Sequence, residues 1–300
     1  MHSISGEITP LAPFDFARAR DFLGGFTPTR GEQRVTEDSI TKAVSVHGQA
    51  VAFALRNVGT VDAPRVAYAI HAARALTASE QALVSDRIGF FLSMMDDLGP
   101  FYALGQADAR FAPVITRLYG LHQPKFLTPF EIASWAILAQ RTPLPVAHQT
   151  KLALIERFGA SITLPEGTFR AFPEATGLLA VDPGELESVV RNERKSGYLR
   201  AVTEAFASVD EAWLRGGDYD EVAAWLRGIR GIGEWSSHFI LIRGLGRMDR
   251  VPTVDGELTK AAGKVYGVGR PFTADEVAEK LAHYGAFQGY WAYYCRAASA

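Results

Sequence analysis

The chain has 300 residues, of which 48% are hydrophobic and 21% charged, and its formal net charge is −2. This composition is ordinary for a globular protein of one or two domains, and no apolar run reaches the roughly 18 to 20 residues that span a membrane. The slightly acidic balance excludes a generic polyanion binder, so any contact with nucleic acid must be local or made by main-chain groups.

The first third of the chain predicts a small antiparallel sheet followed by a helix. At the N-terminus, residues 1–16 lack the basic segment followed by an apolar one that a secretory signal has, so we expect a cytoplasmic protein. Thr77 begins a capping-box pattern that opens a helix running to about Met95, and the Asp-Asp-Leu-Gly-Pro run at 96–100 then breaks the chain. We predict an α+β N-terminal domain over residues 1–98. Its predicted strands are 39–48, 49–59 and 65–72.

From residue 99 onward almost every segment has the apolar spacing of a helix, punctuated by Gly, Pro and Asp. There is no repeat and no long linker of low complexity. We therefore predict a helical region over residues 99–300, and a fold that is mainly α with an α+β N-terminal domain. The predicted helices are 129–138, 145–158, 183–190, 195–208, 219–227, 234–243, 256–266 and 274–283.

A Gly-Ile-Gly turn at 231–233 separates two of these helices. A helix that begins at a glycine turn presents unsatisfied N–H groups and the positive end of its dipole, and phosphate binds well there. The alternative is a plain corner between helices that needs left-handed residues, and the turn by itself favours this alternative.

Asp255 lies about twenty residues further along and precedes another predicted helix. An aspartate at such a position is ordinarily a helix N-cap. Beside a phosphate-binding turn, a lone carboxylate could instead face a deoxyribose and stabilise the positive charge that forms as a base departs.

Gly231-Ile-Gly233 followed by Val251-Pro-Thr-Val-Asp255 resembles the helix–hairpin–helix, Gly/Pro-rich loop and Asp signature of base-excision DNA glycosylases. Within that superfamily the chain is similar to the bacterial 3-methyladenine DNA glycosylase II type. Residues 130–159 are similar to the family segment that ends a helix on a Gln beside the flipped base, and 169–206 to the segment that follows it. The resemblance covers most of the chain and implies the family's fold, a small sheet domain with helical domains.

The resemblance also implies a helix–hairpin–helix over about 219–243 and a catalytic loop over 251–256, in which Asp255 is the catalytic residue. Main-chain N–H groups would bind a phosphate just past the lesion, and carbonyl groups could hold a structural Na⁺ or K⁺. The N–H groups belong to Gly231, Gly233 and Ser236. The carbonyl groups belong to Arg227, Ile229 and Ile232.

Trp235 occupies the position where glycosylase/lyases of the superfamily have a Lys nucleophile. An indole cannot form a Schiff base with the abasic sugar. Cys295 is the single cysteine, which excludes the four-cysteine iron–sulfur cluster of endonuclease III-type relatives. Both absences indicate a monofunctional glycosylase that uses water, needs no cofactor and leaves an abasic site.

Aromatic side chains suit alkylated purines, because N3- and N7-methylated purines are cationic and electron-rich ring faces attract them. Phe287 stands where the family usually has the Trp of a Pro-Trp-Arg-Ser motif, which leaves the substrate range open. For Tyr290 and Trp291, plain helix packing is the alternative. The residues expected in the base pocket are Trp235, Phe239, Phe287, Tyr290, Trp291 and Gln140.

Arg141 follows Gln140 where the family often has an apolar wedge that fills the gap left by the flipped base. A guanidinium plane could fill the gap by stacking on neighbouring bases, or Arg141 could contact solvent or phosphate, with Leu144 as the wedge instead.

The sequence thus predicts an enzyme that excises alkylated purines from double-stranded DNA and works as a monomer. One alternative is a glycosylase for hypoxanthine, uracil or an oxidised purine, since pocket shape decides among lesions. The other is a non-catalytic helix–hairpin–helix DNA-binding protein, against which Asp255 and the aromatic residues argue.

Overall fold

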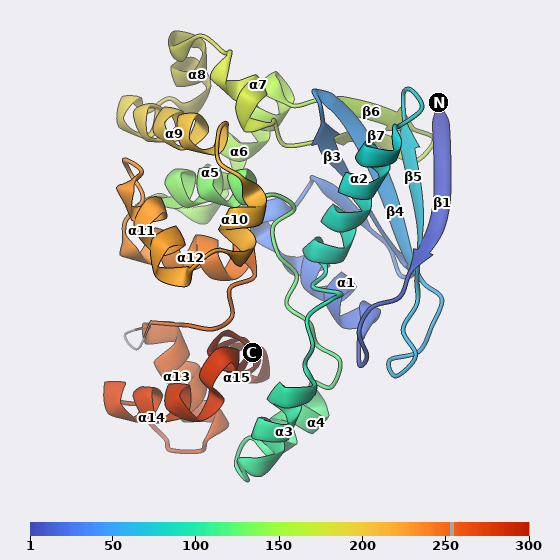
Figure 1. Cartoon of the computed structure of the whole chain (residues 1–300). Helices are drawn as coiled ribbons and strands as arrows, with labels where there is room; N and C mark the ends of the chain where they lie inside the picture. Colours follow the sequence, from blue (N-terminus) through green and yellow to red (C-terminus); the bar gives the residue numbers. More distant parts are fainter. Residues whose placement is uncertain (253–254, 300) are drawn as a thin grey trace.

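The computed structural model of the protein describes residues 1–252 and 255–299, and its N-terminal part is a five-stranded antiparallel sheet in the order β1-β5-β4-β3-β2 (Figure 1). The three predicted strands are present, and two more, β1 and β2, extend the sheet at its edges. The strands are β1 (His2–Ile8), β2 (Gln33–Val35), β3 (Ser39–Val46), β4 (Gln49–Asn57) and β5 (Val66–Ala72).

Two helices accompany this sheet. Helix α1 (Phe16–Gly25) is capped by Asp15, and the single turn η1 (Thr27–Thr29) follows it. Helix α2 (Ala78–Phe91) has the predicted capping box between Thr77 and Glu80, and it ends four residues before Met95. Phe53, Phe91 and their apolar neighbours form the core between sheet and helices.

The opposite face of the sheet is covered by a two-stranded hairpin, β6 (Ser161–Leu164) and β7 (Gly167–Arg170), beside β3 and β4 in Figure 1. Ile162, Leu164 and Phe169 alternate with exposed residues and pack on the alanines of β3 and β4. The sequence predicted a helical region here, so this hairpin differs from the expectation. Strands of four residues are too short to show a clear period.

The rest of the chain is helical and has two hydrophobic cores, which agrees with the predicted fold class. The first core surrounds α5, which is buried on all sides from Pro129 to Leu138. Its helices are α5 (Pro129–Ala139), α6 (Leu144–Phe158), α7 (Ala175–Leu179), α8 (Pro183–Val190), α9 (Glu193–Phe206), α10 (Glu211–Gly216), α11 (Tyr219–Gly228) and α12 (Glu234–Leu245).

The second core joins segments that are far apart in the sequence. Leu98 to Leu121 pack against Met248 to Cys295, and Figure 1 shows α3 and α4 beside the C-terminal helices. Its elements are α3 (Gly99–Ala107), α4 (Ala112–Arg117), α13 (Gly256–Val265), α14 (Ala274–Tyr284), η2 (Gly285–Phe287) and α15 (Gln288–Ser299). Among the described residues, no helix has the length and hydrophobicity needed to cross a membrane.

Candidate functional site

The turn between α11 and α12, which we call the hairpin (residues 229–233), leads into the first turn of α12, whose N–H groups have no acceptor within the helix. The first helical hydrogen bond of α12 runs from Ser237 N to the Gly233 carbonyl at 2.9 Å. The N–H groups of the three preceding residues therefore have no acceptor within the helix. Gly233 is exposed and has an extended backbone, so a ligand can approach these groups.

Gly231 is the position in the hairpin that requires glycine. Its φ is +99°, a conformation that L side chains rarely adopt, and an added Cβ would lie 2.6 Å from the ring of Tyr198 on α9. The hairpin is thus packed directly against α9.

A second loop, which we call the wedge loop (residues 140–143), joins α5 to α6 and contacts the hairpin. Gln140 Nε2 donates to the Gly231 carbonyl at 2.7 Å and lies 3.5 Å from the Ser236 hydroxyl. Lys195 on α9 donates to the Leu138 carbonyl at 2.6 Å and also binds the Thr142 hydroxyl. Helix α9 therefore holds both loops in place.

The two candidate wedge residues are exposed on this loop and its boundary. Arg141 has a φ of +48°, which is uncommon for a residue with a side chain and occurs where the surroundings impose it. Leu144 begins α6 and is 53% exposed. Either side chain is accessible to a partner.

Asp255 uses both carboxylate oxygens. Oδ1 accepts the N–H groups of Glu257 at 3.0 Å and Leu258 at 2.9 Å, so the N-cap that the sequence predicted is present. Oδ2 accepts from Nη2 of Arg296 on α15 at 2.7 Å. The aspartate is only partly exposed. Residues 253 and 254 of the predicted catalytic loop lie outside the described residues.

Trp235 and Phe239 lie together on α12, as their spacing predicts. Trp235 is 65% exposed, and its ring stacks on that of Phe239 with centroids 5.3 Å apart and an angle of 9° between the planes. Phe239 meets the edge of Phe126 at 6.2 Å. An exposed flat aromatic surface thus begins at the hairpin and leads inward.

Tyr290 and Trp291 do not line an open pocket, which corrects the expectation for both. They are 2% and 0% exposed, and Trp291 Nε1 donates to the Tyr266 hydroxyl at 3.2 Å within the second helical core. The alternative of plain helix packing holds for them. Phe287 is partly exposed and packs on Phe101 at 6.2 Å.

Three residues near this surface were missed by the sequence analysis. Phe22 and Phe26, from the N-terminal part, flank the guanidinium of Arg243 on α12. Phe26 also meets the edge of Phe126 at 5.6 Å. Arg243 follows Trp235 and Phe239 at the same four-residue spacing, which could have indicated it. No sequence signal links the two phenylalanines to α12.

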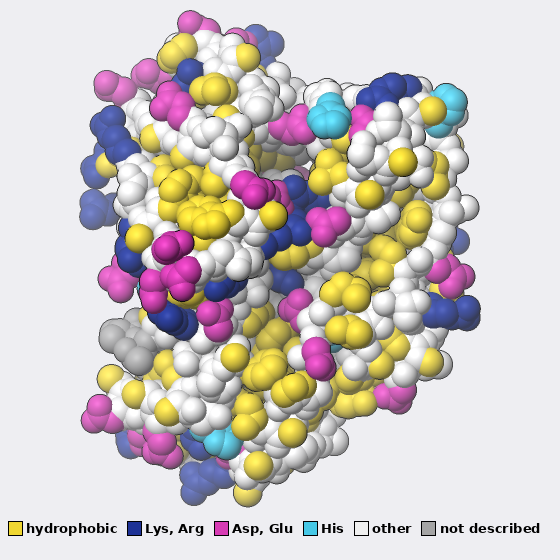
Figure 2. Space-filling model, viewed as in Figure 1, with side chains coloured by type: hydrophobic (Ala, Val, Ile, Leu, Met, Phe, Trp, Pro, Cys, Tyr) yellow, Lys and Arg dark blue, Asp and Glu magenta, His cyan; other side chains and the backbone are white. Residues whose placement is uncertain are grey.

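Positive charge gathers beside the hairpin although the whole chain is slightly acidic. The guanidinium groups of Arg194 and Arg230 lie 5.4 Å and 5.7 Å from the centroid of the Tyr198 ring, and both side chains are exposed. Figure 2 shows Lys and Arg side chains along the edge of the molecule that α9 and α11 form. A local cluster of basic side chains therefore lies beside the hairpin.

The carbonyl groups expected to hold a monovalent cation belong to the end of α11 and the hairpin. The Ile229 carbonyl accepts the Ile232 N–H at 3.0 Å, which leaves its second lone pair for a ligand. The cation stays a prediction. Among the described residues, no cluster of His, Cys, Asp or Glu has the arrangement of a metal site.

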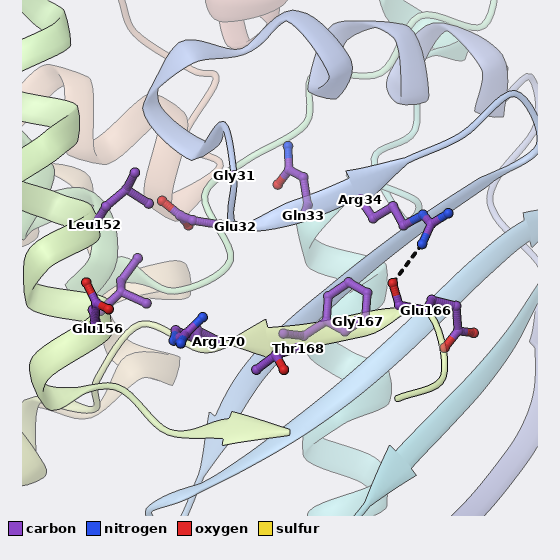
Figure 3. A pocket seen from close by; sticks show the side chains of 12 residues that line it. Gly31, Glu32, Gln33, Arg34, Leu152, Glu156, Glu166, Gly167, Thr168 and Arg170 are labelled. Carbon is purple, nitrogen blue, oxygen red and sulfur yellow. Dashed lines mark hydrogen bonds between the residues drawn. The ribbon is translucent and has the colours of Figure 1, made fainter. Parts of the chain in front are cut away.

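Two hollows on the surface contain none of the predicted site residues, and one of them lies beside the wedge loop. Figure 3 shows one of about 330 Å³ between β2, β7 and α6, where Arg34 donates to the Glu166 carbonyl at 2.8 Å. None of the predicted site residues lines it. A second hollow, of about 550 Å³, lies beside the wedge loop and includes Thr142 and Lys195.

Known proteins resemble this chain in sequence and in structure. The family described as "HhH-GPD superfamily base excision DNA repair protein" matches residues 134–286. A DNA-3-methyladenine glycosylase of Bacillus subtilis is 27% identical over 201 residues, which are 66% of this chain and 66% of that protein. A probable bifunctional transcriptional activator/DNA repair enzyme AlkA of Mycobacterium tuberculosis is 28% identical over 54% of this chain and 32% of its own length.

Two solved structures share the fold over nearly the whole chain. The 3-methyladenine DNA-glycosylase of Archaeoglobus fulgidus superposes with a TM-score of 0.77 at 19% identity and covers 97% of each chain. The 8-oxoguanine glycosylase/lyase of Clostridium acetobutylicum, in complex with double-stranded DNA, superposes with a TM-score of 0.67 at 14% identity, over 98% of this chain and 96% of its own.

Proposed function

The chain belongs to the HhH-GPD superfamily of base excision DNA repair proteins, and from this premise we propose that it is a DNA glycosylase of the 3-methyladenine type. It binds double-stranded DNA, flips a damaged purine out of the stack and hydrolyses the bond between base and sugar. The proposal rests chiefly on the carboxylate of Asp255, which hydrogen bonds hold in a fixed orientation. The same chain has a hairpin that is suited to bind phosphate.

Phosphate binding is supported by two features of the hairpin. The first N–H groups of α12 have no acceptor within the helix, and the positive end of the helix dipole lies at the same place. Arg194 and Arg230 add two exposed positive charges next to Gly231. Phosphate contacts fix the register of a protein on DNA but carry no sequence information, which suits an enzyme that must find damage in any sequence.

Asp255 supplies the charge that the chemistry needs. When the glycosidic bond breaks, the base leaves with the bonding electrons and C1′ of the sugar becomes positive. A carboxylate held close to C1′ in a site from which water is displaced stabilises that charge better than it would in water. Asp255 can then accept a proton from the attacking water, so that C1′ gains a hydroxyl group.

The proposed reaction stops at the abasic site. Trp235 stands at the position that would have to provide an amine for the lyase reaction, and its indole cannot form a Schiff base. Its exposed ring, stacked on Phe239, instead suits a flat cationic purine. We propose that the enzyme acts as a monomer and requires no cofactor beyond a Na⁺ or K⁺ at the hairpin.

An excision assay with duplex oligonucleotides, each containing one defined lesion, tests this function. The panel contains 3-methyladenine, 7-methylguanine, hypoxanthine, uracil and 8-oxoguanine. We expect release of alkylated purines with an intact strand and no covalent adduct when borohydride is added during turnover. A protein that binds these duplexes and releases no base contradicts the proposal and supports a binding module. A trapped adduct contradicts the monofunctional reaction.

A further inference from the structure

A hollow of about 550 Å³ lies beside the wedge loop, between α6, α8 and α9. Helix α8 packs on both α6 and α9, and the three helices lie together in Figure 1. Thr142, near the end of the wedge loop, lines the hollow, whereas Gln140 at the start of the loop binds the hairpin. The wedge loop thus has the hairpin at one end and the hollow at the other.

The charge of this hollow suits nucleic acid. Arg191 and Lys195 line it, and among the described residues of its walls none is Asp or Glu. The hollow between β2, β7 and α6 differs, because three carboxylate side chains line it: Glu32, Glu156 and Glu166. Of these two hollows, only the one beside the wedge loop therefore combines positive charge with an absence of carboxylates that would repel a phosphate backbone.

Arg191 offers unused donors to a ligand in the hollow. Its side chain is exposed, and within residues 1–252 and 255–299 it forms no hydrogen bond or ion pair. A guanidinium has five N–H donors. Lys195, in contrast, already donates to the Leu138 carbonyl and to the Thr142 hydroxyl, so it supports the wedge loop. Arg191 is thus the cation of the hollow that is available to a partner.

The walls of the hollow suit a base better than a phosphate group. Part of the wall is apolar and consists of Val146, Ala153, Val189 and Val190. A phosphate group would lose its water against such a wall without compensation. A base has flat apolar faces and a polar edge, which match the apolar wall and the guanidinium of Arg191. The volume lies within the roughly 300 to 1,000 Å³ that is typical of small-molecule pockets.

The place of the hollow indicates which base of the duplex it suits. In the proposed function the damaged base leaves the stack and meets the exposed ring of Trp235, which follows the hairpin. Its former partner stays in the undamaged strand with an unpaired Watson–Crick edge. Unpaired donors and acceptors cost free energy unless other groups satisfy them. The wedge loop fills the gap between the two bases, and the hollow lies at the end of the loop that is not bound to the hairpin.

We propose, on the basis of the function proposed above, that the hollow receives the base opposite the lesion and that Arg191 donates to the O2 carbonyl oxygen of that base. Cytosine and thymine, the ordinary partners of purines, both have this oxygen. The contact stabilises the duplex in the state in which the damaged base is flipped out. The enzyme thereby gains excision rate from a pyrimidine opposite the lesion, through contacts that a missing base cannot make.

Two duplexes that differ only opposite the lesion test this inference. One has 7-methylguanine opposite cytosine, and the other has it opposite a tetrahydrofuran residue, which carries no base. Single-turnover excision is measured for the wild type and for Arg191→Met, which keeps the length of the side chain and removes its donors. We expect the rate on the cytosine duplex to fall about 10- to 100-fold, the loss of one charged hydrogen bond. The rate on the tetrahydrofuran duplex should change by less than about threefold.

Arg191→Gln keeps a donor without the charge, so its rate on the cytosine duplex should lie between those of the wild type and Arg191→Met. Arg170→Met is the matched control, because it removes an exposed arginine that lines the hollow between β2, β7 and α6, and it should leave both rates unchanged.

Equal losses for Arg191→Met on both duplexes would show that Arg191 contacts phosphate. Wild-type rates on both duplexes would show that it contacts no part of the DNA. Either result, with an active wild type, overturns the inference and leaves the proposed function standing. A wild type that releases no base from either duplex contradicts the proposed function and, with it, the inference.

Discussion

Asp255 is oriented by three donors on two sides. The main-chain groups of Glu257 and Leu258 hold one oxygen, and Arg296 holds the other. A carboxylate fixed in this way needs little reorganisation when charge develops nearby, which is the condition for electrostatic catalysis. The cap role and the catalytic role that the sequence left as alternatives therefore use the same geometry and do not exclude each other.

Glu234 places a negative charge where we propose that phosphate binds. It is exposed in the first turn of α12, beside the free N–H groups of the hairpin. Glu234→Gln should strengthen binding to lesion-containing duplex by about two- to fivefold at low salt, because it removes repulsion of the order of 1 kcal/mol or less. Fluorescence anisotropy with labelled duplex measures this affinity.

The gain from Glu234→Gln should shrink as ionic strength rises, since exposed charges are screened. Asp275→Asn removes the same charge from the first turn of α14, in the other helical core, and should leave the affinity unchanged. If Glu234→Gln binds no tighter than the control, phosphate does not bind at the hairpin.

We propose that the wedge loop is the element that most directly distinguishes duplex from single-stranded DNA. Gln140 binds the hairpin at its start, Lys195 binds the Thr142 hydroxyl further along, and Arg141 has a left-handed backbone between them. Arg141→Ala should slow excision from duplex by about tenfold while a lesion in a single strand loses less, because only the duplex has a stacked gap to fill. Single-turnover rates on the two substrates give the ratio.

Leu144→Ala is the matched variant, because its side chain is exposed at the other end of the same loop. Equal losses for Arg141→Ala on both substrates, with a duplex-specific loss for Leu144→Ala, would assign the wedge to Leu144 and a phosphate contact to Arg141.

The longer elements were predictable because their ends carry local signals. Helix α8 has its predicted bounds, since Asp182 caps it and Pro183 begins it. Strands β3 and β4 end within two residues of prediction, because apolar runs and turn residues delimit them. The β6–β7 hairpin was missed, since its stability comes from packing on the sheet and not from its own sequence.

Site residues that belong to one short motif were predictable from the sequence. Site residues that only the fold brings together were not. Gly231 and Asp255 belong to short motifs of the chain. Arg296, which pairs with Asp255, is 41 residues further along. Phe22 lies more than 200 residues before Arg243. The sequence did not indicate that Tyr290 and Trp291 are buried, because aromatic residues suit a pocket and a core equally.

At the scale of the whole molecule, a buried ionic cluster joins the N-terminal part to the helices. Lys151 on α6 lies 2.5 Å from Glu32, which precedes β2, and 2.6 Å from Glu131 on α5. Lys42 on β3 pairs with Glu32 at 3.0 Å. Because α5 and α6 also bear the wedge loop, the N-terminal part supports the loop as well as supplying Phe22 and Phe26.

Glu32 should make stability depend on pH. Burial alone would raise its pKa, but Lys151 and Lys42 outweigh this and lower the pKa to about 2 from 4.5. Its contribution is therefore complete above pH 4.5 and is lost as the pH falls toward 2. At pH 7, Glu32→Gln should lower the free energy of unfolding by about 3–5 kcal/mol, because it leaves the buried Lys42 without a carboxylate and Lys151 with Glu131 alone. Urea titrations, monitored by tryptophan fluorescence, measure this free energy of unfolding.

The difference between wild type and Glu32→Gln should narrow between pH 4.5 and 2, where the wild-type carboxylate also becomes neutral. Glu37→Gln removes an exposed carboxylate from the same part of the chain and should change stability little at any pH. A difference that stays constant down to pH 2 would mean that Glu32 does not act through its charge.

The most direct test of the account is single-turnover excision by Asp255→Asn. Asparagine keeps an oxygen for the N–H groups of Glu257 and Leu258 and removes the negative charge, so the variant should fold and bind lesion duplex as the wild type does. We expect its hypoxanthine rate to fall at least about a hundredfold, and its 7-methylguanine rate to fall less, because that base is already cationic when it leaves. Wild-type rates on both lesions would show that Asp255 only caps α13, and would contradict the catalytic assignment.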